Sequence, residues 1–499
     1  MTQTHSPDER LPLINWHFFA LAVLALMILF INLHVGDLSG YDDAFHAEEG
    51  RAMLYSGDYW TVRHNGVHNP EFPPLFYWIE ALSMKALGAN DFAAKFPSAL
   101  FGAATIVLVY FIAHELTGQV WLALISMVVM STTQYFMKYA THAMTDATYT
   151  FFFAAAILFY FKGLRRLRFF WLSGFAVGLA LLTRPFVGAI LLAIFFVHLL
   201  WIGRMKLLGS PHVLGGLGFA LLLPAIWYVI QYRLHGLHGL GGPTMLIFAQ
   251  MSSSQAPDFV NVLKGVPKYL MQLLKLYWPW LPFMIIGLVR QSRKAFRERD
   301  SAATLLLIWI ALVFIPFSLS SAKQLRYVMP IFPAFAVLAA MPIYGWIPAR
   351  RREIYFRGFY ALGLAGLVFM HFFPGNLMRA VDMRTIAPVA AAHSNPAQRV
   401  ILYTAGSRQW NYQSQLIWYA NRHTEFPTTF EEVLDLMKAN PGIPVVMDRE
   451  SFPEFESLAR PEFQLNVLVE SERFICFKGQ AVAATTRPDS PAHNSAADN

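Results

Sequence analysis

The sequence predicts a polytopic α-helical membrane protein that carries a small α/β domain near its C-terminal end. Hydrophobic residues make up 56% of the 499 residues and charged residues only 14%, whereas soluble domains carry about a quarter charged residues. The apolar residues also fall into runs long enough to cross a bilayer. From about Arg399 the pattern changes to short strand-like runs, which predict the separate domain.

The apolar runs predict about 11–13 transmembrane helices, because a helix needs about 20 mostly apolar residues to cross the hydrocarbon core. The runs that can be placed lie near residues 13–33, 97–116, 119–137, 145–162, 169–183, 186–202, 212–232, 270–289, 303–320, 327–346 and 356–374. The first run is too long for a signal peptide and lacks a small-residue cleavage site, so we expect a retained span. The fifth and sixth are short and share a Thr183-Arg184-Pro185 break, so a hairpin that barely crosses is an alternative for them.

The positions of the basic residues predict the orientation. Lys and Arg lie mainly in the loops after spans four, six, eight and ten, which share one side if every span crosses. Cytoplasmic loops are enriched in Lys and Arg, so this side is expected to be cytoplasmic. The opposite side then receives the loop 34–96 and everything after residue 374. Because the basic residues serve orientation, the formal charge of +8 does not predict a nucleic-acid partner.

The loop between the first and second spans, residues 34–96, concentrates carboxylates in a chain that has few charges. Its acids are Asp37, Asp42, Asp43, Glu48, Glu49, Asp58, Glu71, Glu80 and Asp91. Asp42 and Asp43 directly precede a helical run, AFHAEEGRAML. An Asp there is commonly an N-cap, but the adjacent pair beside a membrane favours a general-base role toward an acceptor hydroxyl. His46 shares a helical face with Asp42 and either orients a partner or is an ordinary interfacial histidine.

A second candidate is Glu71, in the run NPEFPPLFYW (69–78). Prolines stiffen this backbone, and its aromatic residues suit the headgroup zone. Glu71 is therefore expected at a fixed place beside the bilayer, where it would bind a metal or a substrate amine or hydroxyl. The alternative is a surface glutamate in a proline-rich turn.

The remaining candidates lie at the outer ends of later spans. Asp146, in THAMTDATYT, stands at the entry to an apolar span, where an acid is costly without a partner or a function; an N-cap is the alternative. Arg184, Lys323 and Arg326 are predicted on the same side, where cations are well placed to hold a phosphate. Each alone could snorkel to the headgroups, but three together favour a phosphate site, and Tyr327 is expected to contribute to substrate binding beside Arg326.

The tail combines the strand-like runs RVILY, PVVMD, QLNVLV and RFICFKG with a helical run, FEEVLDLMKAN. We therefore expect a transmembrane domain over 1–376, an α/β domain over 377–480 on the outer face, and a disordered tail over 481–499 that is rich in Ala, Pro, Ser and Thr. The single cysteine, Cys476, excludes a disulfide framework and a cysteine metal cluster. The sequence contains no GxxxxGK[ST], HExxH or GxSxG motif and no GxGxxG after a strand. Since nucleotide-activated donors are generally not available outside the cytoplasm, an activated substrate is expected to arrive through the membrane as a lipid-linked phosphate.

The first outer loop resembles that of the bacterial lipid A aminoarabinose transferases. An acidic pair, an A-E-x-x-R-x-M-L helix and the S-G-D, N-G and E-x-P-P-L-x-Y-W elements match nearly in register, as DDAFHAEEGRAML, SGDYW, NG and EFPPLFYW. Weaker similarity continues through THAMTDATYT, GLALLTRPFVG and LRYVMPIFPAFAVLAA. These enzymes are similar to the protein O-mannosyltransferases (glycosyltransferase 39/83-like) and share with them the GT-C type of lipid-carrier-dependent glycosyltransferase.

The resemblance implies an inverting transferase in a bacterial inner (plasma) membrane. It would move a hexose or pentose from a polyprenyl-phosphate (undecaprenyl) donor to an envelope lipid, glycan or protein on the periplasmic face. By position, Asp42 becomes the base or acceptor-orienting residue, Asp43 its partner and Asp146 a second active-site carboxylate. Glu71 matches a glutamate that helps to hold a metal in the lipid A enzymes, and Arg184 replaces a family lysine near the donor phosphate.

Two departures from the family bear on substrate and cofactor. The family's E-K-P-P reads Glu71-Phe72-Pro73-Pro74, so a phosphate-contacting lysine is absent. In the loop 233–269, His235 and His238 lie out of register with the histidine that could complete a metal site, so a divalent metal at Glu71 remains an open expectation. The alternative functions are a flippase of lipid-linked sugars, which would show charges near the middle of spans and related halves, and a sensor whose tail binds envelope glycan.

Overall fold

The computed structural model describes residues 11–38, 41–240, 267, 271–319, 325–373, 382–406 and 409–482. The chain divides into two compact units, Met1–Ala380 and Val381–Asn499, and each is described by itself below.

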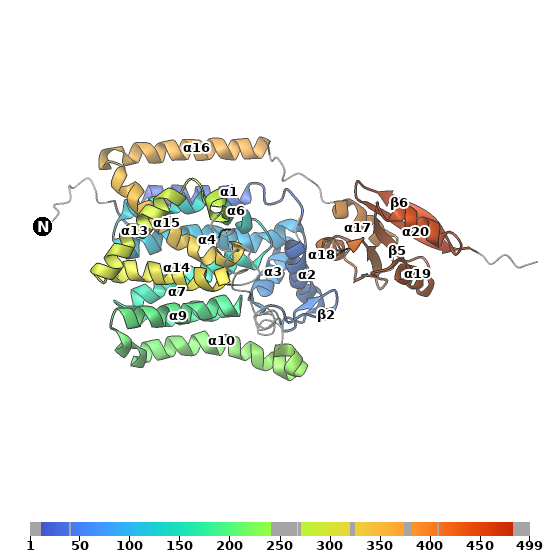
Figure 1. The fold of residues 1–499 in the computed structure, drawn as a ribbon, viewed down its shortest axis with the longest axis horizontal. Helices are drawn as coiled ribbons and strands as arrows, with labels where there is room; N and C mark the ends of the chain where they lie inside the picture. The colour runs from blue at the N-terminus through green and yellow to red at the C-terminus, as the bar shows by residue number, and fades with distance from the viewer. Residues whose placement is uncertain are drawn as a thin grey trace, which may run out of the picture. The chain divides into compact units, whose positions relative to one another are not determined.

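The first unit is a bundle of helices that run side by side (Figure 1). The bundle contains α1 (Trp16–Phe30), α4 (Asp91–Thr117), α5 (Val120–Ser131), α6 (Gln134–Ala140), α7 (Thr145–Gly163), α8 (Phe169–Leu181), α9 (Pro185–Trp201), α10 (Pro211–His235), α13 (Leu281–Arg297), α14 (Ser301–Leu319), α15 (Phe332–Trp346) and α16 (Arg352–Phe372). Short 3₁₀ helices connect some of them: η2 (Met205–Gly209), η3 (Gly236–Leu240), η4 (Leu325–Ile331) and η5 (Ala349–Arg351).

These helices confirm the prediction of a polytopic helical membrane protein, with two differences in detail. The run 119–137 forms the pair α5 and α6, which is bent by 67°. The run 270–289 is interrupted, because residues 271–276 are helical, residues 277–280 form a turn, and α13 then runs from Leu281 to Arg297. Within the described residues, five helices are long and apolar enough to cross a membrane, or six with the bent pair, while α1, α8 and α9 are shorter apolar helices. The number of 11–13 crossings therefore stays a prediction.

Small residues let neighbouring helices of the bundle approach closely. A Cβ added at Gly174 of α8 would lie 1.8 Å from the carbonyl oxygen of Gly216 of α10. No side chain larger than hydrogen fits there, so this pair of glycines fixes how α8 packs on α10. Close backbone approach through glycine is the usual way in which membrane helices associate, since lipid supplies no hydrophobic drive between them.

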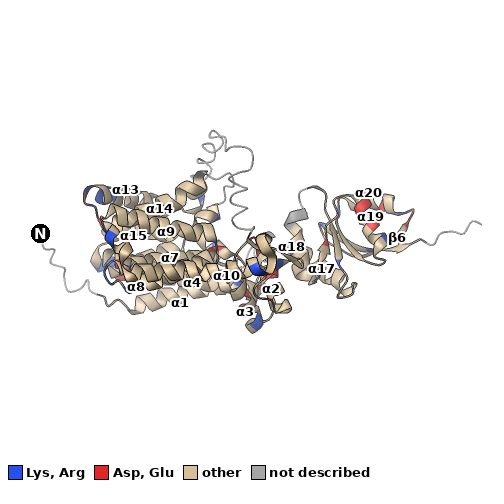
Figure 2. Cartoon of the chain, turned by 90° about the horizontal axis from the view of Figure 1, so that it is seen from below, with Lys and Arg blue, Asp and Glu red and all other residues tan. Residues whose placement is uncertain are grey.

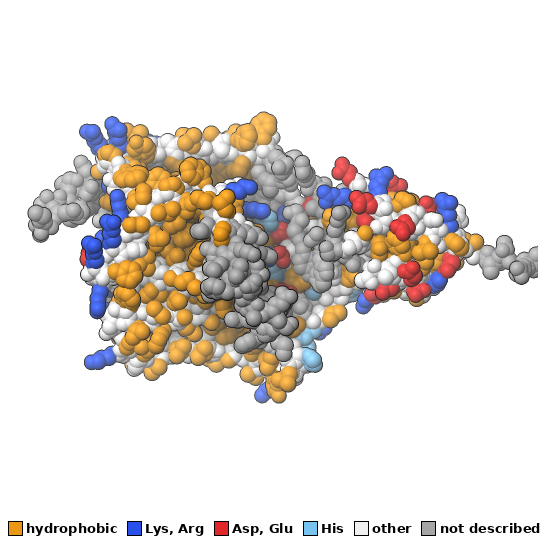
Figure 3. Space-filling model, viewed as in Figure 1, with side chains coloured by type: hydrophobic (Ala, Val, Ile, Leu, Met, Phe, Trp, Pro, Cys, Tyr) orange, Lys and Arg blue, Asp and Glu red, His pale blue; other side chains and the backbone are white. Residues whose placement is uncertain are grey.

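The two ends of the bundle differ in charge. Hydrophobic side chains cover the visible flank of the bundle, and Lys and Arg gather at one end of it (Figure 3). This end contains the tips of α8, α13 and α15 (Figure 2). The segment between α1 and α4 lies at the opposite end (Figure 1). The structure thus separates the basic loops from the acidic segment, as the sequence predicts.

The acidic segment is folded rather than an open loop. It comprises α2 (Tyr41–Ser56), the antiparallel strands β1 (Arg63–His64) and β2 (Val67–His68), and α3 (Leu75–Leu87). Asn65 and Gly66 connect the two strands with positive φ angles of 53° and 79°, which a two-residue hairpin requires. The side chains of Met53, Val62, Phe76, Tyr77 and Ala81 form a small core of their own.

The second unit confirms the predicted α/β domain. Its sheet has the strand order β4-β3-β5-β7-β6, with β3 parallel to β4 and β5, and β7 antiparallel to β5 and β6. The elements are α17 (Asp382–Ala392), β3 (Val400–Tyr403), α18 (Gln409–Ala420), β4 (Thr424–Glu425), α19 (Phe430–Ala439), β5 (Pro444–Asp448), α20 (Phe452–Ala459), β6 (Phe463–Glu470) and β7 (Phe474–Ala481). The predicted tail over 481–499 lies outside the described residues from 483 onward.

Candidate active site

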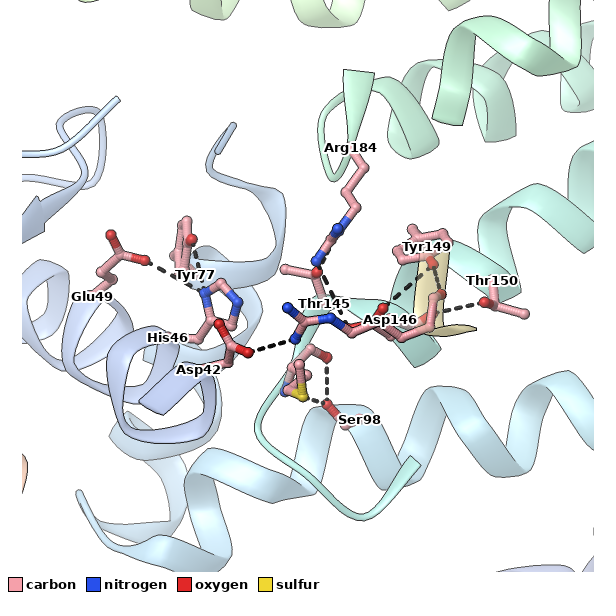
Figure 4. Close-up of polar contacts among 12 residues, drawn as sticks. Asp42, His46, Glu49, Tyr77, Ser98, Thr145, Asp146, Tyr149, Thr150 and Arg184 are labelled. Carbon is pink, nitrogen blue, oxygen red and sulfur yellow. Dashed lines mark hydrogen bonds and ion pairs between the residues drawn. The ribbon is translucent and has the colours of Figure 1, made fainter. Parts of the chain in front are cut away.

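Charged side chains from four distant parts of the first unit converge at the end of the bundle that carries α2 and α3. Asp42 lies in the first turn of α2, Asp146 in the first turn of α7, Arg184 directly before α9 and Arg326 in η4. Figure 4 shows Asp42, Asp146 and Arg184 around a common centre. The structure thus brings together four residues that the sequence marks separately.

Arg326 and Asp42 form the shortest of these contacts. Arg326 Nη1 donates to Asp42 Oδ2 at 2.6 Å, although the two residues are 284 positions apart in the chain. The Arg326 side chain is only 11% exposed, while that of Asp42 is 42% exposed. The carboxylate of Asp42 therefore stays open to a substrate, and the guanidinium is held in place behind it.

Arg184 owes its position to local sequence. The residue precedes Pro185, and the backbone before a proline favours the extended conformation; Arg184 adopts φ −144° and ψ 100°. Its Nε donates to Thr145 Oγ1 at 2.8 Å, and its Nη2 lies 3.8 Å from Asp146 Oδ2. The guanidinium also lies 5.0 Å from the centre of the Phe72 ring. Thr145 and Asp146 thus fix this cation at the start of α7.

Asp146 is fully buried. The N-cap of α7 is Met144, which makes no side-chain capping bond, so the interpretation of Asp146 as an N-cap is wrong. The hydroxyl of Tyr149, one helical turn on, lies 3.4 Å from Asp146 Oδ1 and donates to the carbonyl oxygen of Arg326 at 2.8 Å. Asp146 therefore balances the charge of Arg184, and Tyr149 ties α7 to the backbone of η4.

Buried titratable side chains of α2 and α3 lie beside this centre. Burial raises the pKa of Glu49 and of Glu80 well above the ordinary range of a carboxyl group, and it lowers the pKa of His46 to about 3. Asn69 Nδ2 donates to Glu49 Oε1 at 2.6 Å, and His46 Nδ1 lies 3.1 Å from the hydroxyl of Tyr77 (Figure 4). Burial therefore disfavours the charged form of Glu49, Glu80 and His46.

Of three further sequence candidates, the structure describes Glu71 and Tyr327 but not Lys323. Burial raises the pKa of Glu71, an effect that nearby Arg184 and Arg326 oppose, so Glu71 belongs to the same electrostatic centre. The ring centre of Tyr327 lies 5.6 Å from the Arg326 guanidinium. Lys323 lies outside the described residues.

The described residues hold no group of three or more His, Cys, Asp or Glu side chains that is arranged to bind a metal. His235 stacks on His68 with ring centres 4.0 Å apart, and its Nε2 lies 3.2 Å from Thr61 Oγ1. His238 is exposed. A metal at Glu71 therefore remains an expectation from the sequence.

Three residues near the centre are not among the sequence candidates. Thr145 directly precedes Asp146 and Tyr149 follows it by three residues, so the three lie close together at the start of α7. This spacing is a sequence signal that marks Thr145 and Tyr149 as partners of Asp146. His142 is the third residue, and its Nε2 lies 3.9 Å from Asp43 Oδ2. Asp43 itself is 2% exposed, so it faces the protein interior and not the open side where Asp42 lies.

Comparisons with known proteins agree with this architecture. The family described as dolichyl-phosphate-mannose-protein mannosyltransferase matches residues 71–228. Among solved structures, ArnT from Cupriavidus metallidurans bound to undecaprenyl phosphate superposes with a TM-score of 0.71 and 18% identity, over 93% of this chain and 97% of that one. The chain thus shares the fold of this structure. The apo oligosaccharyltransferase of Archaeoglobus fulgidus is a more distant structural neighbour, with a TM-score of 0.54 and 13% identity over 91% of this chain and 73% of that one.

Curated relatives are similar to this chain over part of their length. An uncharacterized protein of Aquifex aeolicus is 28% identical over 65% of this chain and 63% of the relative. An undecaprenyl phosphate-alpha-4-amino-4-deoxy-L-arabinose arabinosyl transferase 2 of Sodalis glossinidius is 30% identical over 64% of this chain and 58% of the relative. The chain thus spans less than two thirds of the length of these relatives.

Proposed function

We propose that this GT-C protein is an integral-membrane glycosyltransferase that moves a sugar from a polyprenyl-phosphate donor to an envelope acceptor, with inversion at the anomeric carbon. The observation that carries the proposal is the convergence of Arg184 and Arg326 with Asp42 and Asp146 at one end of an apolar bundle. Such a site can hold a lipid-borne phosphate and offer a carboxylate to an attacking hydroxyl.

The two arginines supply the phosphate site. Arg326 is anchored through its backbone by Tyr149, and Arg184 is anchored by Thr145 and Asp146. Their guanidinium groups can each present further N–H donors to phosphate oxygens. The donor class agrees with two relatives: ArnT from Cupriavidus metallidurans is bound to undecaprenyl phosphate, and the Sodalis glossinidius relative is named for that carrier.

The reaction needs one base and one charge-stabilising group. The acceptor oxygen attacks the anomeric carbon and its proton passes to the carboxylate of Asp42. The bond between the anomeric carbon and the phosphate oxygen breaks, so the products are the glycosylated acceptor and the polyprenyl phosphate. Arg184 and Arg326 stabilise the negative charge that develops on that oxygen, as preorganised donors do at an oxyanion. When a donor phosphate engages Arg326, the 2.6 Å contact to Asp42 is loosened and the carboxylate becomes free to accept the proton.

The charge asymmetry of the bundle supports the periplasmic face of a bacterial inner membrane as the location of this site. Lys and Arg gather at the end opposite α2 and α3 (Figures 1 and 2), and the positive-inside rule assigns the basic end to the cytoplasm. A flippase is disfavoured, because the described Lys, Arg, Asp and Glu residues gather toward the ends of the bundle and not along its middle (Figure 2).

Mass spectrometry of reaction products tests the proposal. Detergent-purified protein is incubated with a panel of polyprenyl-phosphate sugars and envelope extract, with and without a chelator. Wild-type protein is expected to transfer one sugar from lipid to acceptor, and loss of transfer with the chelator would support a metal at Glu71. Asp42→Asn should lose turnover and keep donor binding, whereas Glu115→Gln, at the basic end, should behave as wild type. Absence of transfer from every donor would refute the proposed function.

A further inference from the structure

A cavity of about 290 Å³ lies between α8, α9 and α10, toward the basic end of the bundle. It is lined by the N-terminal parts of α8 and α10, the C-terminal part of α9, and one residue each of α7 and η2. Because α9 begins beside Arg184 and the cavity lies along its C-terminal part, the cavity does not belong to the arginine centre. The mechanism above leaves it without a role.

The wall of this cavity is almost entirely hydrocarbon. The two side chains in it that carry a hydroxyl group are Tyr160 and Ser173. The Tyr160 hydroxyl lies 2.8 Å from His198 Nδ1. The Ser173 hydroxyl donates to the carbonyl oxygen of Ala156 at 3.0 Å. Both hydroxyls are therefore already paired within the protein. An aliphatic chain suits this wall, whereas a sugar or a nucleotide would bury polar groups without partners, which costs free energy.

The cavity opens toward the bilayer and has the depth of one leaflet. Phe196 of α9 and Leu217 of α10 line it, although they are also 49% and 40% exposed on the flank of the bundle. The last residue of α10 in the lining is Ala220. From Pro211, where α10 begins, the helix rises about 14 Å to this point at about 1.5 Å per residue. Half of a hydrocarbon core of about 30 Å is similar, so a lipid chain from one leaflet reaches the whole cavity.

Positive charge gathers beside the cavity at the basic end of the bundle (Figure 3). The segments 163–169 and 202–210 contain no Asp or Glu, and their basic residues are Arg165, Arg166, Arg168, Arg204 and Lys206. Arg204 Nη1 donates to the carbonyl oxygen of Leu164 at 3.1 Å, and this bond brings the two segments together. Leu208, which follows Lys206 in η2, lines the cavity. The apolar cavity therefore adjoins a cluster of cations.

We infer that this cavity binds an anionic phospholipid from the leaflet beside the basic end. One acyl chain fills the apolar cavity, and the head-group phosphate lies among the cations of segments 163–169 and 202–210. Basic pockets between membrane helices bind anionic lipid head groups in this way, and a zwitterionic lipid gains less from the same cations. The lipid site is independent of the proposed sugar transfer, because Asp42 and Arg326 lie at the opposite end of the bundle.

Lipid titrations followed by native mass spectrometry of the full chain in detergent test the charge requirement. Wild-type protein should bind phosphatidylglycerol about tenfold more tightly than phosphatidylcholine with the same acyl chains. Lys206→Gln should weaken phosphatidylglycerol binding about fivefold, the contribution of one Lys near a membrane surface. The matched control is Arg350→Gln, since Arg350 is an exposed cation of η5 that does not line the cavity. Equal affinities for the two lipids, or equal losses in Lys206→Gln and Arg350→Gln, would overturn the inference.

Thermal unfolding with and without phosphatidylglycerol tests the cavity itself. A ligand that binds only the folded protein raises its Tm, so the lipid should raise the Tm of wild type. Leu217→Trp places a large ring in the cavity and should remove this rise. Leu221→Trp should keep it, because Leu221 is 50% exposed one helical turn further along α10 and does not line the cavity. An equal rise in the two variants would refute the cavity as the lipid site, and displacement of phosphatidylglycerol by equimolar decaprenyl phosphate would assign the cavity to the carrier lipid instead.

Discussion

Replacing Arg326 by alanine separates a catalytic role from a structural one. The contact between Arg326 and Asp42 is short, 2.6 Å, but the Asp42 side chain is 42% exposed. Ion pairs that water can reach contribute at most about 1 kcal/mol to stability, and the freed Asp42 is solvated. The variant should therefore fold, with a Tm close to that of wild type. If Arg326 stabilises the departing phosphate, turnover should fall about 10²–10³-fold, the loss measured when one preorganised donor is removed from a transition state.

The assay measures initial rates of sugar transfer from lipid to acceptor at saturating donor, together with thermal unfolding in detergent. Arg326→Lys should recover part of the rate, because it restores the charge without the bidentate fork of N–H donors. The matched control is Arg165→Ala, which breaks a pair of similar length, 2.9 Å, to Glu115, with Arg165 68% exposed. A turnover of Arg326→Ala within twofold of wild type, or an equal loss in Arg165→Ala, would refute the assignment of Arg326 to the donor phosphate.

Three further predictions follow from burial. Asp146→Asn leaves Arg184, whose side chain is 13% exposed, without its compensating charge; breaking a buried pair costs about 3–5 kcal/mol, so we expect a Tm lower by several degrees in detergent unfolding, together with weaker donor binding. Gly50→Ala places a Cβ 2.8 Å from the Cβ of Glu80, which should destabilise α2 against α3 by about 1–3 kcal/mol and lower the Tm. Burial lowers the pKa of His46 to about 3. As the pH falls from about 6.5 toward 3, the unfolded chain therefore takes up a proton that the folded chain does not, and the free energy of unfolding falls over that window. His46→Gln should flatten this part of the plot of unfolding free energy against pH.

Each of these three variants has a control or a result that would contradict the prediction. For Gly50→Ala, the control is Gly345→Ala, since a Cβ at Gly345 meets no atom within 4 Å; equal Tm values for the two variants would contradict the packing argument. For Asp146→Asn, an unchanged Tm and an unchanged affinity for decaprenyl phosphate would show that the carboxylate does not hold Arg184. An equally steep profile between pH 6.5 and 3 in His46→Gln would assign the acid sensitivity to other groups.

Hydropathy predicts most of the fold because a bilayer leaves few alternatives. Apolar runs become helices since the backbone must satisfy its own hydrogen bonds in lipid, and the alternation of strands and a helix after Arg399 predicts the second unit. The boundary of α13 was missed because its final turns are amphipathic: the run after Leu288 contains Arg290 and Lys294, so the helix continues where an apolar window ends.

The sequence predicts which residues form the site but not which of them contact each other. Asp42, Asp146, Arg184 and Arg326 stand out because charges are rare in this chain. Their partners depend on tertiary packing: no local pattern joins Asp42 to a residue 284 positions away. The same limit hides the separate orientation of Asp43, because adjacent residues on a helix point about 100° apart and only the packing of α2 decides what each one faces.

The small core of α2 and α3 determines which substitutions away from the reacting groups lower turnover. Met53, Val62 and Tyr77 are buried together, and the hydroxyl of Tyr77 also contacts His46 of α2. These side chains are therefore already ordered before a substrate binds. A surface ordered in advance spares the binding free energy that ordering would consume. Substitutions in this core, such as Tyr77→Leu, would therefore slow turnover by letting the surface that meets the sugar fluctuate. They would mimic active-site defects without removing any group that touches the reaction.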